Sequence, residues 1–197
     1  YATALATYLA ATFALLALVV WRIAPHPLSL LVLLAFPGTF VNLGHGQNAF
    51  LTAALLGGGL VLLDRRPALA GMFLGLLSYK PQFGLLIPIA LLAGMHGRAI
   101  LAAGATVTAL CLLSLAAFGT ETWAAFFAST ALTRDIILEQ GATGWAKIQS
   151  SFSMARSLGA ALPVAYGVQF AVTAAAAVAV IWTWRSAADS AAKAAVL

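Results

Sequence analysis

Residues 64–98, DRRPALAGMFLGLLSYKPQFGLLIPIALLAGMHGR, show most clearly how the chain is organised. Two apolar runs lie between a charged turn at its start and Arg98 at its end, and KPQ separates them at residues 80–82. The segment is long enough for two short helices, but two full bilayer crossings would need about 20 residues each. Pro81 has no backbone N–H and disfavours a helical conformation at the residue before it. The pattern therefore predicts a helical hairpin whose apex carries Lys80.

The composition of the whole chain indicates a membrane protein. Of the 197 residues, 63% are hydrophobic and only 8% are charged, whereas soluble domains carry about 25% charged residues. Such a chain has too little polar surface to cover itself in water. We therefore expect an all-α, polytopic membrane protein, organised as one transmembrane domain over residues 1–197.

Apolar runs predict about seven helical segments, some transmembrane and some broken. The second to fifth runs are shorter than a full crossing. The chain opens inside an apolar run that no charged region precedes, which is not typical of a signal peptide. We therefore expect a fragment that lacks an N-terminal part. The predicted segments are roughly 2–21, 28–42, 48–63, 67–79, 82–96, 99–118 and 161–184.

The distribution of charge predicts the orientation in the membrane. If every segment crosses, one side collects most of the cations, and the positive-inside rule makes that side cytoplasmic. The extracytoplasmic side then receives GHGQN (44–48), KPQ (80–82) and a loop over 119–160 whose charges balance. Within that loop, ETWAAFFASTALTRDIILEQ predicts an amphipathic helix at the membrane interface. Cations and acids on the cytoplasmic side are Arg22, Asp64, Arg65, Arg66, Arg98, Arg185, Asp189 and Lys193.

Lys80 has two interpretations. A lysine near the membrane surface can extend its apolar stem through the acyl chains and place its ammonium among the headgroups without a specific partner. Ionisable residues at membrane depth are, however, functional in many proteins. An ammonium at this level suits the phosphate of a lipid, and Gln82 adds a neutral hydrogen-bond donor beside it.

The GHGQN segment supplies three further candidates. Gln47 and Asn48 can each donate and accept hydrogen bonds. Asn48 directly precedes the apolar run AFLTAALL, so capping of that helix explains it as well as ligand contact does. Capping does not require Gln47, which favours a ligand contact for that residue. His45 is a candidate proton carrier, although a single loop histidine is more often solvated or hydrogen-bonded.

Other signals are weaker. Arg156, in GWAKIQSSFSMARSLG (144–159), is a candidate second cation of a phosphate clamp, with a solvated helix face as the alternative. Gly71 and Gly75 form a GxxxG step that is typical of close helix packing. The single Cys111 excludes a disulfide within the chain. The scattered cations do not form the basic patch of a nucleic-acid-binding protein, and no metal-ligand, P-loop or dinucleotide motif occurs.

Three motifs occur in a characteristic order: GQN (46–48), DRRPALAGMFLGLLSYKPQFGLLIPIALL (64–92) and KIQSSFSMARSLG (147–159). This set resembles glycosyltransferase family 87, membrane enzymes of the GT-C class. The resemblance implies a plasma-membrane enzyme of bacteria that acts on the extracytoplasmic face. It implies transfer of a hexose, with mannose as a candidate, from a polyprenyl-phosphate-linked donor to a glycan or glycolipid acceptor. Lys80 would contact the donor phosphate, and Gln47, Asn48 and Gln82 would line the cavity.

The resemblance also implies what the chain does not carry. Enzymes of the GT-C class use an acidic residue of the first outer loop as general base, and we expect that loop in the N-terminal part that the chain lacks. No catalytic residue is therefore assigned, and the fragment alone should be inactive. No cofactor is implied beyond the lipid-linked donor, and a role for a divalent metal stays open. The alternative is a transporter or flippase subunit for an anionic lipid or solute, which should show paired broken helices.

Overall fold

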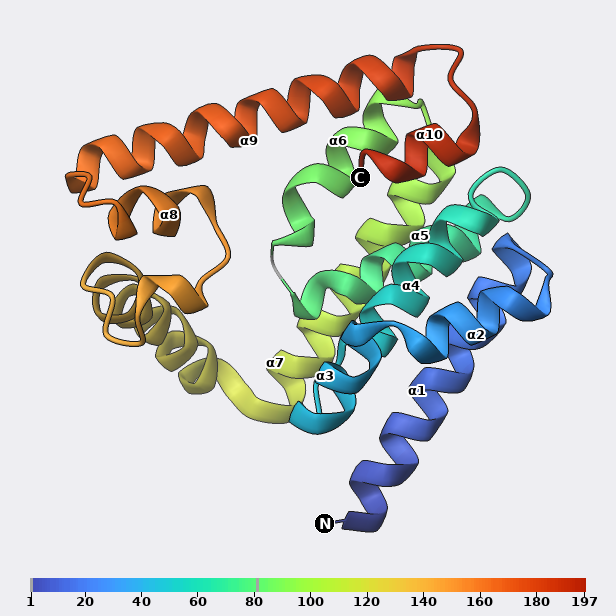
Figure 1. Ribbon diagram of the computed structural model, residues 1–197, viewed down its shortest axis with the longest axis horizontal. Helices are drawn as coiled ribbons and strands as arrows, with labels where there is room; N and C mark the ends of the chain where they lie inside the picture. The colour runs from blue at the N-terminus through green and yellow to red at the C-terminus, as the bar shows by residue number, and fades with distance from the viewer. Residues whose placement is uncertain (1, 81) are drawn as a thin grey trace. The chain divides into compact units, whose positions relative to one another are not determined.

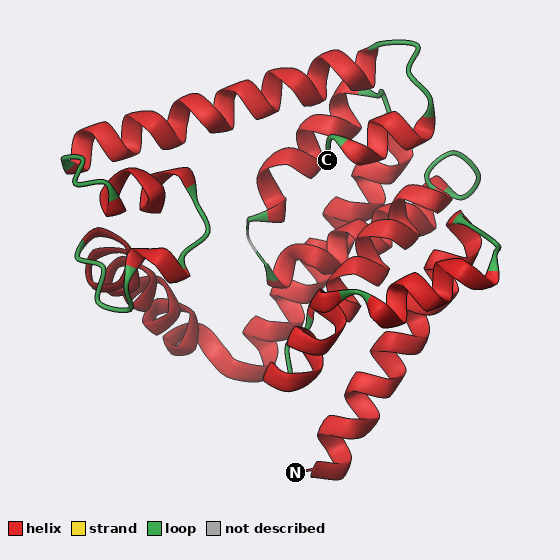
Figure 2. Cartoon of the chain, in the orientation of Figure 1, coloured by secondary structure: helices red, strands yellow, loops and turns green. Residues whose placement is uncertain are grey.

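The computed structural model describes residues 2–80 and 82–197, and every regular element within them is helical (Figure 2). The chain divides into two compact units, the first ending at Thr108 and the second comprising Ala109–Val196. Helix α7, Gly97–Thr133, runs from the first unit into the second (Figure 1). The predicted all-α, membrane-type fold is confirmed.

Within the described residues 2–80 and 82–197, three helices are long and apolar enough to cross a membrane. They are α1 (Ala2–Ile23), α7 with its continuation to Glu139, and α9 (Leu162–Arg185). A bent pair, α2 (Pro27–Ala35) and α3 (Pro37–His45), makes a fourth if it is counted as one span. Each predicted run thus contains helix, while the number of segments that cross, about seven, stays a prediction.

The break between α2 and α3 was not predicted, because residues 28–42 read as one apolar run. The two helices meet at an angle of 54°. Phe36 between them has extended backbone angles, φ −65° and ψ 126°, which is the conformation that a following proline favours. Pro37 therefore explains the bend.

The predicted hairpin around Lys80 is present as two short helices. Helix α5 (Pro67–Leu76) continues as the 3₁₀ turn η1 (Leu77–Tyr79), and α6 begins at Phe83 and ends at Ala93. Pro81, to which the break was attributed, lies outside the described residues. Helix α4 (Ala49–Leu62) packs between α1 and α5.

Small residues bring the helices of the first unit close together. A Cβ atom added to Gly59 of α4 would lie 2.8 Å from the side chain of Leu74 of α5. One added to Gly75 would lie 2.8 Å from the carbonyl oxygen of Ala103 of α7, and one added to Gly71 would collide with the carbonyl oxygen of Ala99. The predicted role of the GxxxG step in close packing is therefore confirmed.

The second unit is built from the rest of α7 and the elements that follow it. A left-handed backbone at Gly119 (φ 75°, ψ 172°) interrupts α7 where the predicted run ends, and the helix then resumes to Thr133. A small core of Phe152, Ala155 and Ala165 joins α8 to α9. The remaining elements are the π-helical turn η2 (Arg134–Glu139), the 3₁₀ turn η3 (Trp145–Lys147), α8 (Ser151–Ser157) and α10 (Ser190–Ala195).

Candidate functional site

The turn that contains GHGQN is closed by Asn42. Helix α3 ends at His45, and the following Gly46 caps it with a left-handed backbone (φ 61°) that suits glycine. The carbonyl oxygen of Asn42 accepts a hydrogen bond from the backbone N–H of Gln47 at 3.1 Å. Its side-chain Oδ1 accepts another from the N–H of Ala49 at 2.9 Å. One residue therefore fixes both the end of α3 and the start of α4.

This arrangement does not support the capping interpretation of Asn48, while ligand contact stays a prediction. Asn48 occupies the position before α4, but its side chain makes no capping hydrogen bond. The helix is capped from a distance by Asn42, which is only 2% exposed. Asn48 contributes its backbone carbonyl, which accepts from the N–H of Thr52 at 3.0 Å and from its hydroxyl at 2.9 Å. The amide of Asn48 is therefore available for a ligand, as is that of the exposed Gln47.

The GHGQN turn and the KPQ turn are neighbours in the structure. The hydroxyl groups of Thr52, on the first turn of α4, and Tyr79, in η1, lie 2.7 Å apart. Lys80 follows Tyr79 directly. This hydrogen bond joins α4, which follows the GHGQN segment, to η1, which precedes Lys80. That the two polar segments lie on the extracytoplasmic face stays a prediction.

Lys80 lies in a defined turn with a free ammonium group. Its backbone N–H donates to the carbonyl of Leu77 at 2.9 Å, and its own carbonyl accepts from the N–H of Phe83 at 3.1 Å. The side chain is half-buried, and its Nζ lies 5.9 Å from the centre of the Tyr79 ring. Within residues 2–80 and 82–197, no hydrogen bond or ion pair engages the ammonium. The charge is therefore available to an anion.

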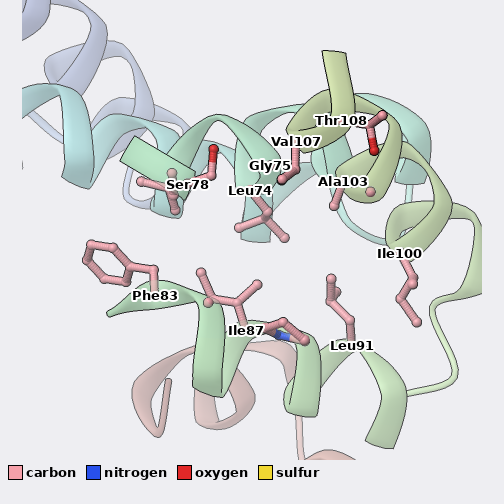
Figure 3. A pocket seen from close by; sticks show the side chains of 14 residues that line it. Leu74, Gly75, Ser78, Phe83, Ile87, Leu91, Ile100, Ala103, Val107 and Thr108 are labelled. Atoms are coloured by element: carbon pink, nitrogen blue, oxygen red, sulfur yellow. The ribbon is translucent and has the colours of Figure 1, made fainter. Parts of the chain in front are cut away.

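An apolar groove of about 390 Å³ begins beside this turn. Ser78 and Phe83, which flank the turn, form one end of the groove, and Leu91 and Ile100 form the other (Figure 3). The walls come from α5 with η1, from α6 and from the first half of α7. The turn that carries Lys80 is therefore close in sequence to one end of a groove lined mainly by apolar side chains.

The other predicted site residues of the first unit have less defined surroundings. His45 is the last residue of α3 and is exposed. Gln82 is exposed at the start of α6 and makes no capping hydrogen bond. Three residues that the sequence reasoning missed, Asn42, Thr52 and Tyr79, organise these turns. Tyr79 alone had a signal, because it adjoins Lys80.

Arg156 belongs to the second unit and is tied to backbone groups there. Its Nη1 donates to the carbonyl of Ala160 at 2.7 Å and its Nη2 to that of Glu139 at 3.4 Å. The guanidinium stacks on Trp145, with the carbon 4.7 Å from the ring centre. Its Nε is buried and has no partner among the described residues. These contacts hold η2, η3 and α8 together, so a role for Arg156 in phosphate binding stays a prediction.

Glu139 is the acidic side chain of the second unit with the most defined contacts. Its Oε1 accepts a hydrogen bond from the hydroxyl of Tyr166 at 2.6 Å and forms an ion pair with Nε of Arg134 at 3.5 Å. These contacts link η2 to α9 through the carboxylate of Glu139. In the described part of the chain, no group of three or more His, Cys, Asp or Glu side chains could hold a metal ion.

Comparison with known protein families identifies a family that matches the chain. The model of glycosyltransferase family 87 matches residues 1–197, the whole chain. Comparisons with curated proteins and with solved structures give no significant match.

Proposed function

The chain belongs to glycosyltransferase family 87, and we propose that its donor is a sugar linked to a polyprenyl phosphate. The transferred sugar would be a hexose, with mannose as the candidate. The acceptor would be a glycan or glycolipid on the extracytoplasmic face of the bacterial plasma membrane. Family membership favours this function over the transporter or flippase alternative, which also uses a lysine at membrane depth.

The observation that carries the proposal is the position of Lys80. Lys80 directly follows Tyr79, whose hydroxyl group is hydrogen-bonded to Thr52, and the nearby Ser78 lines one end of the apolar groove. Among the described residues, no hydrogen bond or ion pair engages its ammonium. A lipid phosphate has the matching chemistry, because its head is anionic and its tail is hydrocarbon. A nucleotide-linked sugar has no part that suits the groove. The chemistry of the site therefore supports a lipid-linked donor.

The reaction would be a displacement at the anomeric carbon. The acceptor oxygen forms a bond to that carbon, and the bond to the phosphate oxygen breaks with its electron pair left on the phosphate. Negative charge therefore grows on the leaving phosphate in the transition state. Lys80 would stabilise this charge more than it stabilises the donor, which lowers the barrier. The residue that takes the acceptor proton is not assigned.

The polar side chains around Lys80 would contribute neutral contacts. Gln47, Asn48 and Gln82 carry free amides that suit sugar hydroxyls or phosphate oxygens. His45 would lie at the rim of the same site. Arg156 would add a second cation only if the full site brings it to the phosphate.

The proposal is tested by donor choice. The full-length protein in lipid nanodiscs is given the same radiolabelled hexose on a polyprenyl phosphate or on a nucleotide, with a membrane extract as acceptor. We expect transfer from the lipid-linked donor only. Repetition with a chelator shows whether a divalent metal takes part. Transfer from the nucleotide donor, or from neither donor, would overturn the proposal.

A further inference from the structure

We infer that the last two turns of α9 bind an anionic phospholipid of the bilayer in an open hollow of the second unit. The hollow has a volume of about 420 Å³. Its lining combines one guanidinium group with mainly apolar side chains, and the inference does not depend on the proposed sugar donor. The residues that line the hollow are Val178, Ile181, Trp182, Arg185 and Ser186.

The helix repeat places most of these side chains on one face of α9. The lining residues within the helix stand at positions i, i+3, i+4 and i+7, the spacing of a single stripe along a helix. The stripe is open, because Trp182 is 76% exposed and Val178 is 64% exposed. Seven residues of helix rise about 10 Å, so the stripe can follow a lipid from its headgroup into the upper part of an acyl chain.

The opposite face of the same turns is fixed inside the protein. Val180 is fully buried and Trp184 is only 3% exposed. The indole N–H of Trp184 donates a hydrogen bond to the carbonyl of Lys193 in α10 at 2.9 Å. The open stripe therefore belongs to a helix end that internal packing holds in one orientation.

The polar end of the hollow carries two donors that the protein leaves unused. Within residues 2–80 and 82–197, no hydrogen bond or ion pair engages the guanidinium of Arg185, and none engages the indole N–H of Trp182. The hydroxyl of Ser186, by contrast, donates to the carbonyl of Thr183 at 2.8 Å. A guanidinium and an indole N–H suit the phosphate and ester oxygens of a phospholipid.

The charges at this end of the chain favour an anionic lipid. Over residues 158–197 the cations are Arg185 and Lys193, and the acidic side chain is that of Asp189. Asp189 caps α10, because its Oδ1 accepts from the N–H of Ala192 at 2.7 Å. Arg185 is thus the charge that the hollow offers to a ligand.

The position of the hollow along α9 agrees with this occupant. Helix α9 is long and apolar enough to cross a membrane, and Arg185 is its last residue. If α9 crosses, the guanidinium lies at the level of the lipid phosphates, and Trp182 lies at the interface, where tryptophan is enriched. The apolar side chains of Ile181 and Val178 then lie at the level of the acyl chains.

The experiment measures lipid binding to the full-length protein in detergent. Phosphatidylglycerol is titrated in, and the rise of the unfolding temperature gives an apparent dissociation constant. Phosphatidylcholine tests the net charge, diacylglycerol tests the chains without a phosphate, and glycerol phosphate tests the headgroup without chains. The variants are Arg185→Gln and Trp182→Phe. Arg22→Gln is the matched control, because Arg22 also lies in the last turn of a candidate span, α1, but does not line this hollow.

We expect phosphatidylglycerol to raise the unfolding temperature of the wild type more than any of the other three compounds. Arg185→Gln should weaken its binding about fivefold, the effect of one cation beside an anionic lipid surface. Trp182→Phe, which keeps the ring but removes the N–H, should weaken it less. Equal stabilisation by any of the other three compounds, or equal binding by the Arg185 variant and the Arg22 control, would overturn the inference.

A second measurement uses the wild type and does not depend on the folding of variants. A phosphatidylglycerol with a photoreactive group in its upper acyl chain should label Ile181 or Trp182, as identified by mass spectrometry of peptides. An excess of unlabelled phosphatidylglycerol should suppress this labelling. Labelling of other segments alone, or labelling that the excess lipid does not suppress, would contradict the site.

Discussion

The hydroxyl groups of Thr52 and Tyr79 lie 2.7 Å apart, and this contact joins the start of α4 to the turn that carries Lys80. It links residues 27 positions apart in the chain. In the proposed site, this contact joins the helix that follows GHGQN to the turn that precedes Lys80. The predictions below follow from this site and from the packing that supports it.

Replacement of Thr52 by Val should weaken the site without emptying the space that the side chain fills. The change leaves the hydroxyl of Tyr79 without its partner and removes the bond to Asn48, at a cost of about 1–3 kcal/mol. We expect a lower unfolding temperature and a higher KM for the donor. Thr122→Val serves as control, because Thr122 is exposed and bonds only to the carbonyl of Phe118. Equal effects of the two changes would contradict the linking role.

Asn42 and Asn48 should respond differently to replacement by Ala. Loss of Asn42 removes the cap on the N–H of Ala49 and should lower the free energy of unfolding by about 1 kcal/mol. Loss of Asn48 removes no capping bond, so stability should hardly change while donor affinity falls. Chemical unfolding in detergent and binding of a lipid phosphate measure the two effects. If Asn48→Ala lowers the free energy of unfolding more than Asn42→Ala does, Asn48 and not Asn42 caps α4.

The contact of α5 with α7 should not tolerate a methyl group. Gly75→Ala would place a Cβ 2.8 Å from the carbonyl oxygen of Ala103, and such overpacking costs about 1–3 kcal/mol. Gly104→Ala, where the added methyl meets nothing, should be neutral or stabilising because Ala favours helix. The unfolding temperatures of the two variants, compared with that of the wild type, test this prediction. A Gly75→Ala protein as stable as the wild type would disprove the close contact.

Arg156 should prove necessary for the order of the second unit. Arg156→Ala loses two hydrogen bonds to carbonyls and the stacking on Trp145. Arg156→Lys should not restore them, because an ammonium lacks the planar, forked set of donors. Limited proteolysis should cut residues 134–160 faster in both variants. If both resist cleavage like the wild type but lose donor binding, Arg156 acts on the phosphate instead.

The sequence predicts local features of this fold better than contacts between distant segments. The hairpin around Lys80 and the packing glycines follow from proline, glycine and hydropathy, which act over a few residues. Pro37 also indicates the bend at Phe36, but residues 28–42 are apolar throughout and were therefore predicted as one segment. The helix that continues beyond Gly119 was predicted correctly as helix, while its place in an outer loop at the membrane interface stays a prediction.

The organisation of the site was not predictable in the same way. Asn42 reaches across a turn to cap α4, and the residue next to the helix was the more obvious cap. Thr52 and Tyr79 lie inside apolar runs, where a hydroxyl has no pattern to reveal its partner. Lys80 could be recognised as a candidate from the sequence, because placing a charged side chain at membrane depth is unfavourable in free energy and rarely occurs without a function. The groove depends on the packing of α5, α6 and α7 against one another, which no local sequence pattern reveals.

The most direct test of the account is the rate of hexose transfer from a polyprenyl-phosphate donor by the full-length Lys80→Ala protein. Arg65→Ala, which removes an exposed cation from the turn before α5, is the matched control. We predict that the Lys80 variant folds and loses at least about 100-fold in kcat/KM, as expected for loss of a group that stabilises transition-state charge, while the control keeps the wild-type rate. Wild-type transfer by a folded Lys80→Ala protein would contradict the account.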